Sequence, residues 1–161
     1  MSDAAKTTDW TPDGAALPSG PQEGRIYLLP TRSLADGQPA YVERQRTWPK
    51  EARSDGLPLE FAMESGNRQF LSEYSSGPEF WEVALAFVGP ITDVILLAVQ
   101  MILLKAGRDV GHSDAESLAH PVKVSIAELT FDGSALRGVA VEGTGDEVLS
   151  TIKGIIKAAK K

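Results

Sequence analysis

Residues 80–105 read FWEVALAFVGPITDVILLAVQMILLK and form the longest apolar stretch of the chain. Before the closing Lys105, only Glu82 and Asp93 carry a charge. A helix of this composition needs apolar surface against most of its circumference, so the rest of the chain has to cover it. The stretch therefore predicts a long apolar helix around which a small domain is arranged.

The predicted helix runs over residues 77–106. It begins at a capping box in which Ser76 is followed three residues later by Glu79, and it ends before Gly107. A Gly-Pro pair at 89–90 interrupts it, because proline inside a helix removes a backbone donor and crowds the preceding turn, at a cost of about 3 kcal/mol. The break is either a kink in one helix or a junction between two helices.

The polar residues of this helix share one narrow face. Glu82, Gly89, Asp93 and Gln100 are separated by seven, four and seven residues, and these spacings return to nearly the same side of a helix. Three environments suit such a polar seam: water beside a covered helix, a subunit interface, or the inside of a membrane assembly. Insertion of one copy into a bilayer sums to a free energy near zero, because Asp93, Gln100 and the proline offset about −4 to −8 kcal/mol from the apolar side chains.

The remaining patterns predict an α+β fold in which β-hairpins pack on the long kinked apolar helix, together with a C-terminal amphipathic helix. The last helix opens at a capping box of Thr144 and Glu147. The predicted organisation is a disordered N-terminal tail at 1–22 followed by a single domain at 23–161. The elements predicted within this domain are, in order, a hairpin region 24–75, the apolar helix 77–106, a loop 107–120, a hairpin 121–142 and a helix 144–160.

Within the hairpin region we expect three strand features. Residues 25–29 read as a short strand, and residues 40–48 read as an edge strand that Pro49 ends before a polar connector. Residues 58–75 read as a hairpin, because Leu59, Phe61 and their neighbours alternate with period two before a Ser-Gly-Asn turn.

Composition excludes several classes of site. The chain has no cysteine, so disulfides, thiolate metal sites and cysteine nucleophiles are excluded. A net charge of −6 argues against general nucleic-acid binding. His112, Glu116 and His120 have metal-ligand spacing if they are helical, but Pro121 and a capping role for Glu116 favour a structural reading, so we predict no metal and no cofactor.

The absence of a catalytic motif predicts a non-enzymatic accessory protein of the cytoplasm that self-associates through its apolar helix and binds a protein partner. No nucleic acid or small-molecule substrate is predicted. The alternative is a membrane-associated component that inserts residues 80–105 as a pore or anchor. The predicted interaction residues are Trp81, Phe87, Pro90, Asp93, Leu97, Gln100 and Leu104, with Lys153, Lys157 and Lys160 as a surface-binding group.

Overall fold

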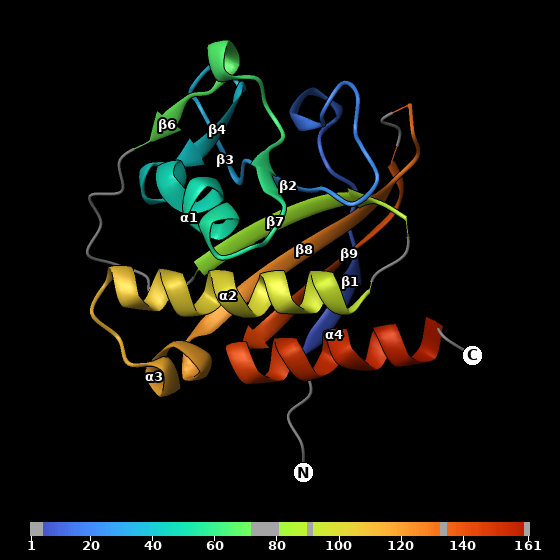
Figure 1. Ribbon diagram of the computed structural model, residues 1–161. Helices are drawn as coiled ribbons and strands as arrows, with labels where there is room; N and C mark the ends of the chain where they lie inside the picture. Colours follow the sequence, from blue (N-terminus) through green and yellow to red (C-terminus); the bar gives the residue numbers. More distant parts are fainter. Residues whose placement is uncertain (1–4, 72–80, 90–91, 133–134, 160–161) are drawn as a thin grey trace.

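The computed structural model describes residues 5–71, 81–89, 92–132 and 135–159 (Figure 1). The strands are β1 (Lys6–Asp9), β2 (Ile26–Leu29), β3 (Arg32–Ser33), β4 (Pro39–Val42), β5 (Leu59–Phe61), β6 (Phe70–Leu71), β7 (Trp81–Val88), β8 (Pro121–Leu129) and β9 (Ala135–Thr144). The α-helices are α1 (Trp48–Ser54), α2 (Asp93–Asp109), α3 (Asp114–Ala119) and α4 (Gly145–Ala159). Short 3-10 turns lie at Gly14–Ala16, Glu43–Thr47 and Ser65–Asn67.

Two sheets organise the fold, and the predicted α+β class is confirmed. The larger sheet has six strands in the order β1-β9-β8-β7-β2-β5, and the smaller has three in the order β3-β4-β6. Helices α2 and α4 lie side by side across one face of the larger sheet (Figure 1). The main core fills the space between these helices and the sheet.

The predicted long kinked helix is wrong. Residues Trp81–Val88 form β7, which pairs with β8 on one side and β2 on the other. Gly89 follows it with φ +107°, a conformation that glycine adopts at little cost, and α2 begins only at Asp93. The apolar run is therefore a central strand followed by a separate helix, and the predicted capping box at Ser76 and Glu79 lies outside the described residues.

The pairing of β7 with β8 is parallel, so the chain has to return to the starting edge between them. Helices α2 and α3 make this return. Antiparallel pairing of β8 with β9 gives the hairpin at the C-terminal side, and α4 follows it directly. The capping box that opens α4 is present, since the Thr144 N–H donates to Glu147 Oε1 at 2.8 Å and the Glu147 N–H donates to Thr144 Oγ1 at 3.2 Å.

Part of the predicted disordered tail is a strand. Residues Lys6–Asp9 form β1 and pair antiparallel with β9 at the edge of the larger sheet. The Trp10 N–H then donates to the carbonyl of Gly138 at 3.1 Å, and the Trp10 side chain joins a second apolar cluster on the sheet face opposite α2 and α4. The chain between Trp10 and Leu17 thus covers part of this opposite face.

One row of charges crosses the opposite face of the larger sheet. Lys6 lies beside Glu142, Glu142 beside Lys123, and Lys123 beside Glu82 in the strand register. Arg32 extends the row by an ion pair with Glu82 at 3.0 Å. Because opposite charges on neighbouring strands attract, this alternation favours the observed register.

Two local predictions in the 24–75 region are corrected. The predicted edge strand ends early at Val42, and Trp48–Ser54 is helix α1 with Pro49 in its first turn, where the missing N–H costs nothing. The predicted 58–75 hairpin does not form: β5 pairs in parallel with β2, and β6 pairs in parallel with β4. The alternation of apolar residues marks strands correctly, but the partners of these strands are distant in sequence.

Tyr41 connects the two sheets. From β4 of the smaller sheet, its buried hydroxyl donates to the carbonyl of Leu28 in β2 at 2.6 Å. Its ring contacts Phe61 edge-on at 5.0 Å and stacks with Phe70 at 5.7 Å between centroids. Burial raises the pKa of Tyr41 to about 12.

Replacing Tyr41 with Phe is expected to lower the free energy of unfolding by about 1 kcal/mol. The Leu28 carbonyl loses one of its two donors and keeps the Ala62 N–H at 3.0 Å, while the Met63 N–H loses the Tyr41 hydroxyl as its acceptor. The raised pKa adds a pH dependence. The unfolded chain loses the Tyr41 proton near 10.0 and the folded chain only near 12, so this contribution is complete below pH 10 and is lost as the pH rises towards 12. Urea unfolding measured from pH 10 to pH 12 should show that the free energy of unfolding falls with pH in the wild type and falls less steeply in Tyr41→Phe. Equal pH dependence in the two proteins would contradict the assignment of this contribution to Tyr41.

Helix α3 packs closely on the last turn of α2. Gly107 is buried there, and a Cβ at this position would lie 1.6 Å from Ser117 Oγ and 2.6 Å from Ser117 Cβ. Ser117 is itself buried, and its hydroxyl donates to the Ser113 carbonyl at 2.9 Å. The contact between the two helices therefore requires glycine on α2.

A Gly107→Ala variant is expected to lose about 1–3 kcal/mol of unfolding free energy, because the added methyl group displaces α3. Gly154 in α4 provides a matched control, since a Cβ there meets nothing within 4 Å and alanine favours the helix by about 0.5–1 kcal/mol. Thermal unfolding followed by circular dichroism should give opposite shifts for the two variants. A shift of the same sign and size in both would remove the packing explanation.

Candidate functional site

The predicted interaction residues fall on separate elements. Trp81 and Phe87 lie on β7, are 8% and 4% exposed, and belong to the main core. Pro90 and Lys160 lie outside the described residues. The other predicted residues of the apolar stretch lie on α2 and its first turn: Asp93, Leu97, Gln100 and Leu104. The sequence prediction missed the buried position of Trp81 and Phe87 because it treated the two elements as one helix.

Trp81 packs against both histidines of the chain. Its ring stacks on that of His120 with centroids 3.8 Å apart and planes 9° apart, and His112 lies 5.8 Å away. The two imidazole centroids are 5.6 Å apart. This cluster joins the start of β7 to the ends of α2 and α3, so its geometry is that of a packing contact.

The side chains around these histidines have structural partners. The Ser113 N–H donates to Glu116 Oε1 at 2.7 Å, and this bond lowers the pKa of Glu116. Nδ1 of His120 lies 2.9 Å from the Pro121 carbonyl, which can only accept a hydrogen bond, so Nδ1 carries the proton. Over the described part of the chain, no group of three or more potential ligands is placed to hold a metal ion.

Helix α2 has two apolar faces, and only one of them is covered. Its inner face packs on the larger sheet and comprises Ile95, Ala98, Val99, Ile102, Leu103 and Ala106, all buried. We define the outer face as the side of α2 opposite these buried residues, comprising Asp93, Val94, Leu97, Gln100, Met101, Leu104 and Arg108. Met101 and Leu104 on this face are half-buried, and Met101 also packs against the main core. Val94 and Leu97 on this face are 47% and 50% exposed, which makes them two of the large apolar side chains that the described chain leaves in solvent.

The charges of the outer face are segregated by sign. Asp93 stands in the first turn of α2, where the helix carries a partial positive charge, and Arg108 stands in the last turn, where the partial charge is negative. Each side chain is therefore attracted to its own end of the helix. Arg108 also pairs with Asp114 at 3.5 Å, with both side chains about 60% exposed. On the flank, Lys105 pairs with Glu51 of α1 at 3.5 Å. The centre of the outer face, from Leu97 to Leu104, carries no charge.

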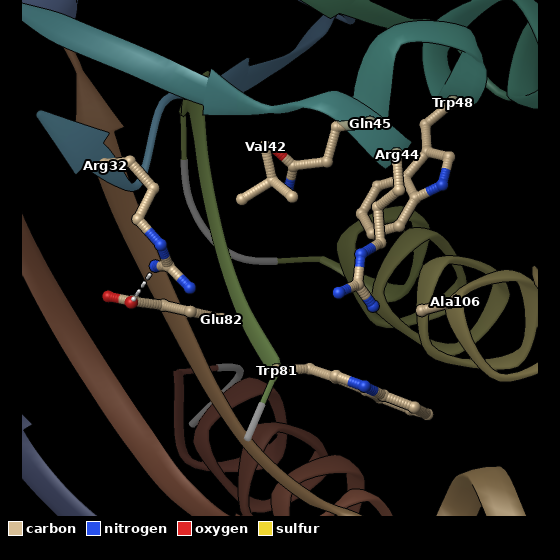
Figure 2. Close-up of a pocket in the computed structure, with 8 residues that line it drawn as sticks. All are labelled: Arg32, Val42, Arg44, Gln45, Trp48, Trp81, Glu82 and Ala106. Carbon is tan, nitrogen blue, oxygen red and sulfur yellow. Dashed lines mark hydrogen bonds and ion pairs between the residues drawn. The ribbon is translucent and has the colours of Figure 1, made fainter. Parts of the chain in front are cut away.

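Glu82, the first residue of the predicted polar seam, points away from α2. It accepts a hydrogen bond from Arg32 Nη1 at 3.0 Å, drawn as a dashed line in Figure 2. Beside this pair lies a space of about 20 Å³, lined also by Arg44, Gln45 and Trp48. That volume suits one or two water molecules rather than a substrate. Gln45 Oε1 is buried without a protein partner, and a water there would supply its hydrogen bond.

A larger polar cavity lies on the opposite face of the sheet, and sequence reasoning did not find it. Its volume is about 200 Å³; its floor includes Ala84 and Ser125, and its roof includes Trp10 and Asp13. Small side chains at every second position of β7 leave this space beneath the covering N-terminal segment. The small residues Ala84 and Ala86 within Trp81–Val88 are a sign of spare space beside the strand, but they do not show which segment covers it.

The predicted surface-binding group lies partly within the described chain. Lys153 and Lys157 are exposed on α4, whose apolar stripe of Val148, Ile152 and Ile156 is buried against the sheet. The apolar side of α4 therefore packs into the main core. The lysines extend into solvent away from it.

Two further findings concern membrane-spanning helices and similarity to known proteins. Among the helices that the structure describes, none combines the length and the apolar composition needed to span a bilayer. No protein-family model, no curated protein and no solved structure matches this chain.

Proposed function

We propose that this chain is a non-enzymatic accessory protein that self-associates through the outer face of α2 and binds a protein partner. The observation that carries the proposal is the half-exposed apolar surface of Val94 and Leu97 on a helix whose inner face is already buried. Burying a large aliphatic side chain is worth about 1.5–3 kcal/mol. A symmetric interface gains this for both copies, which helps to offset the entropy lost on association.

The polar clusters support a non-enzymatic role because their members are held in structural pairs. Arg32 is paired with Glu82, and Arg137 donates through Nε and Nη2 to Glu128 Oε2 at 3.1 and 3.0 Å. Glu116 and Glu147 cap helices. Each of these carboxylates stabilises the fold through the bond it already makes.

The membrane-acting alternative has less support. Insertion of residues 80–105 as one helix would require β7 to leave the centre of the larger sheet and to break its pairing with both β8 and β2. Self-association uses only surface that is already exposed. We therefore prefer the interaction proposal, with Lys153 and Lys157 of α4 as a second exposed surface for a protein partner.

A Leu97→Lys variant tests the self-association. Lysine is a good helix former, so α2 should persist, while a charge placed at the centre of the outer face should weaken the dimer by about tenfold or more. Sedimentation velocity over a range of concentrations measures this change.

Phe131 supplies the matched control. It is 70% exposed and follows β8 rather than lying on α2, so Phe131→Lys introduces the same charge without changing a residue of the outer face. The control should associate as the wild type does. A wild-type chain that remains monomeric at every concentration would refute the proposal.

A further inference from the structure

Two pairs of residues on the outer face of α2 are placed symmetrically along the helix. Leu97 and Leu104 are equally far from the midpoint between Gln100 and Met101. Asp93 and Arg108 are also equally far from that midpoint, but they carry opposite charges. A helix face of this kind is complementary to a copy of itself that runs the other way.

The two orientations of a helix pair differ in their electrostatics. In a parallel pair, Asp93 would face Asp93 of the second copy, and Arg108 would face Arg108. In an antiparallel pair, each Asp93 faces Arg108 of the second copy, and the two helix dipoles oppose each other. The exposed pair of Arg108 with Asp114, at 3.5 Å, is weak enough to be shared with a second carboxylate.

We infer that the partner of the outer face is a second copy of this chain, with its α2 antiparallel across a twofold axis that passes between Gln100 and Met101. Leu97 then packs on Leu104 of the second copy, and Asp93 pairs with Arg108 of the second copy. This inference rests on the proposed self-association and adds its orientation and register. Such an isologous contact closes the assembly at two chains.

The flanking elements are compatible with this contact. The Lys105–Glu51 pair lies on the side of α2 that faces α1, and the buried Leu103 points into the core. The apolar centre of the outer face lies between these two sides. A second helix that approaches between these two sides leaves the Lys105–Glu51 pair intact and meets the Arg108–Asp114 pair at the last turn of α2.

Single cysteines test the orientation, because the chain has none of its own. In the inferred dimer, cysteines at Gln100 of the two copies lie beside the axis, whereas cysteines at Val94 are offset by 13 residues of helical rise, about 20 Å. A short bis-maleimide reagent should therefore cross-link Gln100→Cys efficiently and Val94→Cys at least about tenfold less.

The outcomes separate the two proposals. Equal cross-linking at both positions would show a parallel dimer and overturn this inference while leaving self-association intact. A monomer by sedimentation, without cross-linking at either position, would overturn the proposed function itself. Cross-linking at Val94 alone would overturn the register.

Charge reversal gives an independent check. Asp93→Arg and Arg108→Asp should each weaken the dimer by about fivefold, and the double variant should recover it. The recovery cannot arise from helix stability, because the double variant places both charges at the unfavourable ends of the helix dipole. A double variant weaker than either single variant would overturn the charge pairing.

Discussion

The parallel pairing of β7 with β8 is the constraint on which the rest of the fold depends. Neighbouring parallel strands cannot be joined by a tight turn, so the chain has to cross the sheet and return between them. Helix α2 makes that crossing, and its inner face becomes the cover of the main core. The outer face is left in solvent because the crossing helix lies at the surface of the layer, with α1 and α4 beside it (Figure 1). The candidate interface thus follows from the topology of the sheet.

Much of the second half of the fold can be predicted from the sequence, because its signals are local. The capping residue Thr144 marks where α4 begins, and the alternation after Pro121 marks β8. Helix α3 is a correction, because Asp114–Ala119 lies inside the predicted loop at 107–120. The central error was at Trp81–Val88. Its large residues recur at every second position, which indicates a strand, but the adjoining apolar helix hid this period within one longer run. Strands β1, β5 and β6 were missed or mispaired because their partners are distant along the chain.

The residues of the candidate site could be predicted only in the part of the apolar stretch that is a helix in the structure. Leu97, Gln100 and Leu104 share a face in a helix of 3.6 residues per turn, and they share the outer face in the structure. Trp81 and Phe87 were grouped with them by the same period, yet a strand turns both into the core. The polar cavity could not be predicted, because its roof comes from Trp10 and its floor from β7 and β8, segments that only the tertiary fold brings together.

The position of β1 has a consequence for the order of folding. Its partner β9 begins at Ala135, so β1 cannot pair until a strand far along the chain has been made. Contacts of such long sequence separation form slowly, because the loop between the strands has to close first. During synthesis β2 can pair with β7 as soon as both exist, whereas the β1 edge of the sheet has to assemble last. Protection of the β1 amides from hydrogen exchange would therefore report that the β8–β9 hairpin has already joined the larger sheet.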